Sequence, residues 1–260
     1  MKLKYISFVA FAMTLSLSSC YDLNRFPGDQ LSNEKFYRNE EHAKEAMMAV
    51  YNQMQKEDVF GLQFAMDGLG GIAMGYDPQS YQTIQRGTYD VKNGRVLGKW
   101  QNLYEGIARA NGVLQNVDRC QMSDELKVQY KAEAKFMRAL YYFTLMDFFG
   151  GVPLYDESVI VSESYSEMKN KRESIENVRA FILKDLKEAA DKLPEAWDKA
   201  NYGRATKYAA LAQMGKVYLY AKDYQHAKDC FQQVISSGKY ALYDNYADLF
   251  KPGGDESSEM

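Results

Sequence analysis

The stretch KAEAKFMRALYYFTLMDFFGGVPL, residues 131–154, decides the fold of this chain. Together with the residues from Asp124 onward it predicts a helix over 124–149, and its second half is apolar almost all round, which is typical of a helix buried on several sides. Gly150 permits the left-handed turn that ends many helices, and the proline that follows cannot continue one. Arg138 lies in the middle of this segment, where we expect it to form a structural ion pair.

Helical periodicity continues on both sides of this segment. Apolar residues recur at spacings of three and four, which predicts further helices over 33–58, 99–117 and 174–193. Asn39 is a candidate cap inside the first range, because its side chain accepts hydrogen bonds from free backbone amides. Trp100 lies on the apolar face of the second range and is interpreted as core. The chain is therefore predicted to be all-α.

The segment GRATKYAALAQMGKVYLYAKDYQHAKDCFQQVISSGKY, residues 203–240, fits the spacing of a tetratricopeptide repeat. Small residues at two signature positions let antiparallel helices approach closely, and two aromatic residues fill the space between them. The signature positions hold Leu211, Met214, Gly215, Tyr218, Ala227 and Phe231. Trp100, Leu103 and Ile107 repeat the beginning of this pattern upstream, which indicates a second hairpin. A generic helical hairpin is the alternative for both units.

Residues 61–98 differ in texture, since they hold eight of the 18 glycines and show no helical period. A long loop inside a helical protein is usually functional or disordered, and aromatic residues argue against disorder. Flat aromatic rings beside fixed polar groups suit the apolar faces and hydroxyl edges of sugars. The candidate ligand-binding residues of this loop are Tyr76, Tyr81, Arg86 and Tyr89. The alternative is that these side chains pack the loop onto the helices.

The N-terminus has the pattern of a secretory signal. Lys2 and Lys4 precede an apolar run over residues 5–17, which is too short to span a membrane. The run ends at Leu17-Ser18-Ser19-Cys20, which resembles the lipobox of bacterial lipoproteins. We expect a signal peptide over 1–19, lipid attachment at Cys20 and a tether over 20–32, since several acyl chains together anchor a protein firmly. An ordinary secretory signal with a chance cysteine is the alternative.

Composition excludes several classes of function. The 260 residues are 46% hydrophobic and carry a net charge of −3, and no basic stripe is present, which argues against a nucleic-acid partner. Cys120 and Cys230 either pair in an oxidising compartment or remain inert thiols, and the cysteine spacing does not indicate zinc. We predict no metal site, no cofactor and no catalytic residue.

Short catalytic motifs find no support in their context. Residues 68–73 formally fit G-x-G-x-x-A, but no strand precedes them and Pro78 breaks any following helix. Two S-x-x-K matches lack the accompanying motifs of acylating serine enzymes. His42 and His226 lie in charged helical segments and form no H-E-x-x-H. A carboxylate pair for glycoside hydrolysis stays open as an alternative, because acidic residues are plentiful.

Several stretches together resemble the SusD/RagB family of lipoproteins. They are the lipobox with DLNRFPGDQLSNEKFYRNEEHAKEAMMAVYNQM, then WQNLYEGIARAN, KAEAKFMRALYYFTLMDFFGGVPL, DLKEAADKLP, GRATKYAALAQMGKVYLYAKDYQHA and ISSGKYALYDNYADLF. The resemblance implies an all-α, SusD-like scaffold with tetratricopeptide-like hairpins over residues 33–260. It also implies a lipid-anchored protein of the cell outer membrane, exposed at the surface, that binds glycans or related nutrients.

The resemblance further implies a SusC-like TonB-dependent transporter as partner, on which such proteins sit as a lid without doing chemistry. Members of the family usually run far longer, so we expect that a C-terminal part is missing here. Two other hypotheses remain: a tetratricopeptide adaptor that binds a protein through a concave helix groove, and a surface glycoside hydrolase.

Overall fold

The computed structural model describes residues 36–61, 81–159, 171–242 and 245–251. The chain divides into two compact units, Met1–Tyr37 and Arg38–Met260. In the first unit the description covers Phe36 and Tyr37, whose rings meet edge to face at 5.2 Å.

In its described part the second unit has helices as its regular elements, which agrees with the all-α prediction, although the helix Tyr81–Gln85 lies in the segment predicted to be a loop. Its α-helices are α3 (Glu40–Asn52), α5 (Tyr81–Gln85), α6 (Gly94–Asn116), α7 (Asp124–Phe149), α8 (Ile175–Lys192), α9 (Lys207–Tyr220) and α10 (Tyr224–Ser236). Shorter helical turns are η1 (Gln53–Gln55), η2 (Glu57–Gly61), η3 (Val117–Arg119), η4 (Lys199–Asn201) and η5 (Tyr246–Phe250). Within the described residues, Asn39 and Gln121 form one isolated parallel β-bridge.

Short polar side chains fix where the helices begin. Asn39 accepts a hydrogen bond from the His42 amide, which confirms its predicted role as a cap and starts α3 there. Asn93 accepts from the first amides of α6, so that helix begins at Gly94, inside the segment predicted to be a loop. The first predicted helix, 33–58, is also shorter than expected, because Lys56 is extended and separates η1 from η2.

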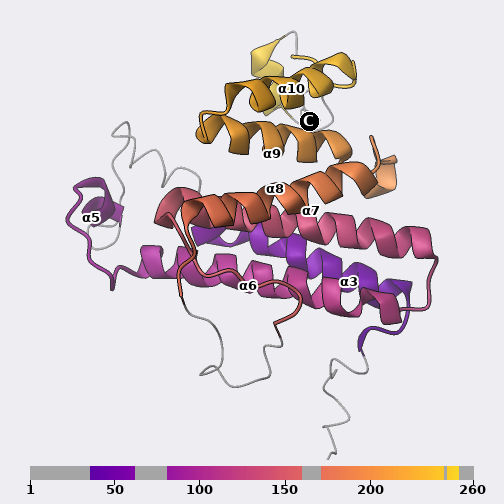
Figure 1. The fold of residues 1–260 in the computed structure, drawn as a ribbon, viewed down its shortest axis with the longest axis horizontal. Helices are drawn as coiled ribbons and strands as arrows, with labels where there is room; N and C mark the ends of the chain where they lie inside the picture. Colours follow the sequence, from indigo (N-terminus) through magenta and orange to yellow (C-terminus); the bar gives the residue numbers. More distant parts are fainter. Residues whose placement is uncertain (1–35, 62–80, 160–170, 243–244, 252–260) are drawn as a thin grey trace, which may run out of the picture. The chain divides into compact units, whose positions relative to one another are not determined.

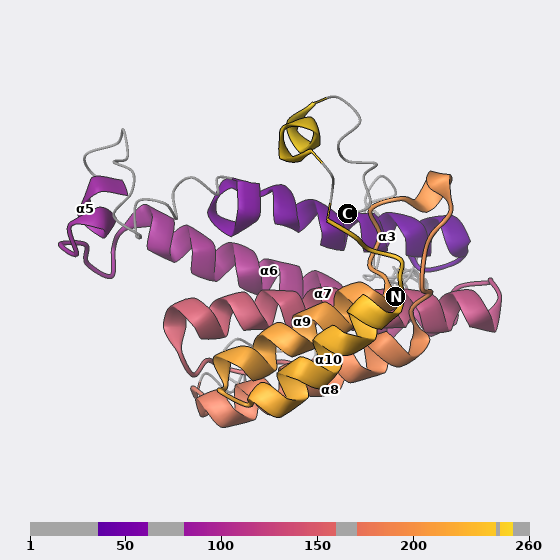
Figure 2. The same cartoon turned by 90° about the horizontal axis from the view of Figure 1, so that it is seen from above.

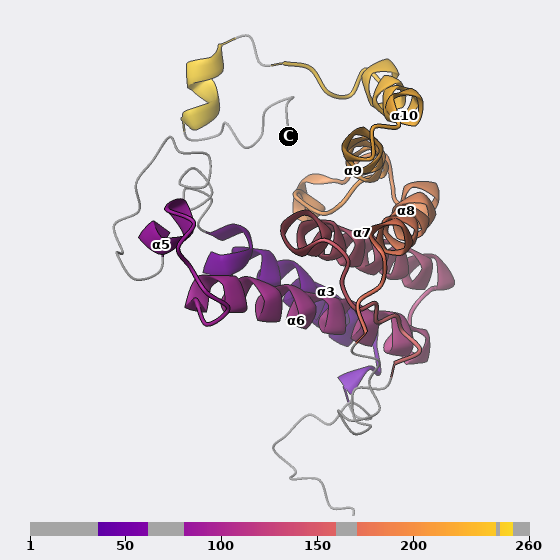
Figure 3. The same ribbon diagram turned by 60° about the vertical axis from the view of Figure 1, so that its left-hand side comes forward.

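The helices pack mainly on their neighbours in the chain. In Figure 1, α6, α7, α8, α9 and α10 follow one another, and α3 lies against α6 and α7. Figure 3 shows α3 and α6 side by side. The helix α7 lies between α6 and α8, and most of its second half is buried, as its nearly uniform apolar character predicts.

The hairpin of α9 and α10 makes the close contact predicted at its glycine. A Cβ added to Gly215 would lie 2.5 Å from the ring of Phe231, so the two helices meet where only glycine fits. Ala227 on α10 is also buried. Figure 2 shows the two helices lying along each other. Of the described cysteines, Cys120 and Cys230 are both buried free thiols, so the disulfide alternative is not realised.

The connector after α7 is fixed to the helices by side-chain hydrogen bonds. Three side chains from one stripe of α6 donate to its backbone carbonyls. The pairs are Tyr104 with Pro153 at 2.8 Å, Asn111 with Tyr155 at 3.0 Å and Gln115 with Glu157 at 2.8 Å. Arg138 adds a bond to the Glu157 carboxylate and forms the predicted buried ion pair with Asp185. Segment 152–159 is thereby attached along α6 and α7.

Candidate functional site

One cavity of about 210 Å³ lies where η2, the α5 segment, the start of α6 and the end of α7 meet. Figures 1 and 2 both show α5 beyond the N-terminal end of α6. Acidic, basic and aromatic side chains line this cavity, which we call the aromatic pocket. The lining residues are Glu57, Asp58, Tyr81, Ile84, Tyr89, Arg95, Val96, Lys99, Phe148 and Phe149.

Two local contacts hold the walls of the aromatic pocket together. Asn93 caps α6 and also donates from Nδ2 to the Thr83 hydroxyl at 3.0 Å, which ties α5 to the start of α6. Gly98 lets η2 approach α6, since a Cβ at this position would lie 2.2 Å from a carboxylate oxygen of Asp58. Asn93 therefore ties α5 to the start of α6, and Gly98 leaves room for the Asp58 carboxylate against the first turns of α6.

Arg95 is the centre of the charged wall. Its Nη1 lies 2.9 Å from Glu57 Oε2 and 3.2 Å from Asp58 Oδ1. The guanidinium also lies over the ring of Tyr81, with Cζ 4.6 Å from the ring centroid, which is the geometry of a cation–π contact. Arg95 thus holds two carboxylates and one aromatic ring in fixed positions.

Lys99 is a buried cation on the same helix. It is 7% exposed, and its Nζ donates to the Val59 carbonyl at 3.2 Å. The ammonium lies 4.6 Å from the centroid of the Phe148 ring. Burial lowers the pKa of Lys99, and the negative charge of Asp58 opposes this shift only in part.

The aromatic side chains of the pocket differ in how far they are engaged. Tyr81 lies under Arg95, and Phe148 lies against Lys99 while remaining 41% exposed. Tyr89 is 50% exposed and, within the described part of the chain, its ring stacks on no other ring and no cation. Tyr89 therefore offers an open apolar face to a ligand.

The pocket brings together two of the four predicted ligand-binding residues. Tyr81 and Tyr89 line it. Arg86 follows α5, is exposed, and donates to Gln82 at 3.2 Å, and it does not line the pocket. Tyr76 lies outside the described residues.

Sequence reasoning did not single out Arg95, Lys99 or Phe148. Phe148 stands near the end of the strongly apolar helix and was predicted only as part of it. Trp100, predicted to be core, is half-buried beside Phe149, at 5.1 Å between ring centroids, and the Arg172 guanidinium lies 5.4 Å from its ring. These residues come together where the start of α6 meets the end of α7. The periodicity within one helix does not predict which helix ends meet, so it could not identify them.

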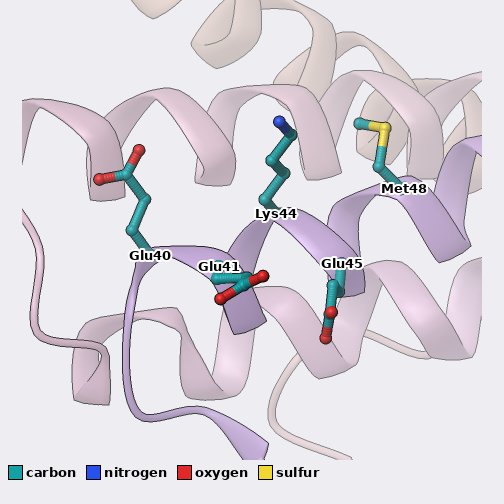
Figure 4. Close-up of a pocket in the computed structure, with 5 residues that line it drawn as sticks. All are labelled: Glu40, Glu41, Lys44, Glu45 and Met48. Atoms are coloured by element: carbon teal, nitrogen blue, oxygen red, sulfur yellow. The ribbon is translucent and has the colours of Figure 1, made fainter.

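A second hollow, of about 680 Å³, lies on the exposed face of α3 and has a different character. Figure 4 shows Glu40, Lys44 and Met48 in one row and Glu41 and Glu45 in the next, all projecting from a single helix. These spacings of four residues are those of an ordinary solvated helix face. The described residues contain no group of three or more metal-ligating side chains, and none of the described helices is long and apolar enough to cross a membrane.

Comparison with known proteins agrees with this helical architecture. A family model described as "Starch-binding associating with outer membrane", SusD-like, matches residues 28–219. The SusD-like protein P25 of Formosa agariphila is 27% identical over 259 residues, which cover 93% of this chain and 48% of that protein.

Solved structures give the same picture. A SusD-like protein from Bacteroides fragilis superposes with a TM-score of 0.77 at 22% identity, covering 91% of this chain and 46% of that one. A laminarin-binding SusD-like protein superposes with a TM-score of 0.74 at 30% identity, covering 82% and 48%. The chain therefore spans about half the length of the relatives it matches. The helical hairpins, the packing order and the match over residues 28–219 together show that the chain belongs to the SusD-like family.

Proposed function

We propose that this protein binds glycans at the cell surface and that the aromatic pocket is part of its ligand site. The observation that carries the proposal is the exposed ring of Tyr89 beside a wall of fixed polar groups, in a member of a family described as starch-binding. Sugars present apolar ring faces and hydroxyl edges, so a site for them combines flat aromatics with fixed donors and acceptors. A solved relative at 30% identity is described as laminarin-binding, which supports a glycan as ligand.

The proposal assigns a separate part to each wall of the aromatic pocket. Tyr89 stacks on a sugar ring, and Phe148 extends the apolar surface on the α7 side. The oxygens of Glu57, whose side chain is 65% exposed, accept hydrogen bonds from sugar hydroxyls while Arg95 holds the carboxylate in place. Because Arg95 already fixes Tyr81 and both acids, the site needs little ordering when a ligand binds.

The protein is proposed to be anchored at the cell surface by lipid and to pass its ligand to a transporter. The N-terminal pattern supports a signal peptide over 1–19, lipidation at Cys20 and a tether over 20–32, all of which lie outside the described residues. Residues 33–260 form the ligand-binding scaffold, anchored in the outer membrane and exposed to the medium. The captured glycan passes to a SusC-like TonB-dependent transporter, and co-purification of the lipidated protein with a large outer-membrane barrel tests that step.

The pocket favours binding over hydrolysis. A glycosidase needs two carboxyl groups that face each other across the cleft, about 5 to 10 Å apart. The two acids among the described lining residues, Glu57 and Asp58, are adjacent in sequence and both bond to the same nitrogen of Arg95. They form one wall of the pocket, and we therefore propose that the protein is not an enzyme.

Isothermal titration of the full chain, purified in detergent, tests the proposal. The ligands are laminarin, starch fragments and other polysaccharides, and a thermal melt by circular dichroism shows that each sample is folded. Tyr89→Ala should weaken binding roughly tenfold, since an aromatic contact is worth about 0.5–1.5 kcal/mol beyond its buried area. Tyr224→Ala is the matched control, because Tyr224 is 65% exposed on α10 and does not line the pocket.

Two results would contradict the proposal. Equal losses in both variants, or no loss in either, would place the ligand elsewhere on the protein. A cooperative melt without binding to any polysaccharide would favour the adaptor hypothesis.

A further inference from the structure

The charges of the aromatic pocket indicate which glycans it accepts, an inference that rests on the proposed function. Two acids and two bases are among its described lining residues, so their formal charges cancel. A charged ligand responds mainly to those groups that are exposed to solvent and are not fully neutralised by a partner of opposite charge within the protein.

Arg95 is already committed to partners within the protein. One of its nitrogens bonds both Glu57 and Asp58, and its guanidinium lies over Tyr81. A carboxylate or sulfate on a sugar would have to compete with two carboxylates that the fold holds in place. Arg95 therefore attracts acidic sugars only weakly, because two carboxylates of the protein already pair with it.

Lys99 is committed as well, and it is buried. Its ammonium bonds the Val59 carbonyl and lies over the Phe148 ring. A ligand anion that reached it would be moved out of water next to the carboxylate of Asp58. The free energy needed to desolvate a second anion there exceeds the attraction of a single ammonium group.

The charge that remains open to solvent is negative. The side chain of Glu57 is 65% exposed, whereas those of Arg95 and Asp58 are 29% and 19% exposed.

We propose that the aromatic pocket accepts uncharged glycans and excludes those that carry uronate or sulfate groups. Neutral sugars need only the ring face of Tyr89 and acceptors for their hydroxyls, which the Glu57 carboxylate supplies. Anionic sugars meet the same carboxylate as a like charge. The selectivity therefore follows from pairing both cations of the wall inside the protein.

The test uses pairs of ligands that share a sugar backbone and differ in charge. They are laminarin with sulfated laminarin, methyl-esterified polygalacturonate with polygalacturonate, and N-acetylglucosamine hexamer with glucosamine hexamer, titrated into the full chain in detergent at low and high salt. We expect at least one neutral ligand to bind and its anionic partner to bind at least about tenfold more weakly. Tyr89→Ala should remove the neutral binding, which assigns it to this pocket.

Glu57→Gln tests the mechanism with a small change in shape. We expect the affinity for the anionic partner to rise about threefold to fivefold at low salt, because one opposing charge is removed, and the gain to fade at high salt. The affinity for the neutral ligand should not rise, because glutamine keeps one acceptor oxygen and loses the other, so the ratio of neutral to anionic affinity should fall. Glu45→Gln is the control, since it makes the same change in net charge on α3, outside the pocket.

The outcomes separate this inference from the proposed function. Sulfated laminarin or polygalacturonate binding as tightly as its neutral partner would overturn the inference while glycan binding stands. Tighter binding of the glucosamine hexamer than of its acetylated partner at low salt would support the inference, because the open Glu57 carboxylate attracts a cation, whereas tighter binding of an anion would not fit it. An unchanged anion affinity in Glu57→Gln would overturn the charge mechanism, and no binding of any ligand would overturn the proposed function itself.

Discussion

Arg138 on α7 donates two hydrogen bonds to Asp185 on α8, from Nε at 2.7 Å and from Nη2 at 2.9 Å, and both side chains are 3% exposed or less. The bidentate pair joins two helices that are neighbours in the packing order. The remaining nitrogen of Arg138 bonds Asn111 on α6 and Glu157 in the connector. One guanidinium therefore connects three helices and the segment that crosses them.

Arg138→Met should lower the free energy of unfolding by about 3–5 kcal/mol, because it leaves the buried carboxylate of Asp185 without a partner. Urea denaturation followed by circular dichroism measures the loss. The double variant Arg138→Met with Asp185→Leu should recover most of the stability, since no buried charge is then left unpaired. A double variant no more stable than the single one would show that the guanidinium acts through its other contacts.

Arg204 should be equally important for the contact between α3, α7 and the segment before α9. It pairs with Glu133, whose side chain is fully buried, and lies 3.9 Å from the centroid of the Trp197 ring. Arg204→Met should cost about 3–5 kcal/mol and shift tryptophan emission to longer wavelength, because Trp197 loses its stacked partner. Tyr51→Phe is the milder companion: the Tyr51 hydroxyl donates to Glu133 and accepts from the Ala205 amide, and losing both bonds should cost about 1–3 kcal/mol. Equal effects of the two variants would contradict this ranking.

Gly215→Ala should destabilise the α9–α10 hairpin. The new Cβ would meet the Phe231 ring at 2.5 Å, and such overpacking costs about 1–3 kcal/mol, partly offset by the better helix propensity of alanine. Gly94→Ala is the control, because nothing lies within 4 Å of a Cβ there. Chemical denaturation should place the Gly94 variant within about 0.5 kcal/mol of wild type. If Gly215→Ala left the free energy of unfolding unchanged, the two helices would be able to move apart without losing stability.

Acid should weaken the attachment of the connector through Glu157. Burial favours the neutral form of this carboxyl, but the hydrogen bond and the charge of Arg138 outweigh it, so its pKa lies below the ordinary 4.5. A carboxyl with a depressed folded-state pKa stabilises the fold above its unfolded pKa, and this stabilisation is lost as pH falls through the folded value.

The pH dependence can be separated from that of the other acids by a variant. Thermal melts between pH 6 and pH 3 should show a smaller loss of Tm in Glu157→Gln than in wild type, because glutamine cannot titrate. Parallel curves for the two proteins would rule out a contribution from this residue.

Local rules predicted the helices well and their meeting points poorly. The helix 124–149 was predicted with its observed bounds, since its apolar pattern and the glycine that ends it are both local features of the sequence. The start of α6 was missed, because the Asn93 cap stands inside a glycine-rich stretch that shows no periodicity. Tyr81 and Tyr89 were found by the aromatic content of that stretch. Arg95 and Lys99 were not, because their roles depend on η2 approaching through the space that Gly98 leaves open.

The succession of α6 to α10, each packed mainly on the next, makes this part of the protein close to a linear array. In such an array stability is the sum of nearest-neighbour terms, and no single event has to break all contacts at once. Amide protons should therefore exchange in order, first in α10, whose main neighbour is α9 alone, and last in α7. The helix α7, which carries the AEAKFMRA segment, should then be the last of these helices to unfold. A probe placed in α7 would therefore report on the most stable part of the array in a folding experiment.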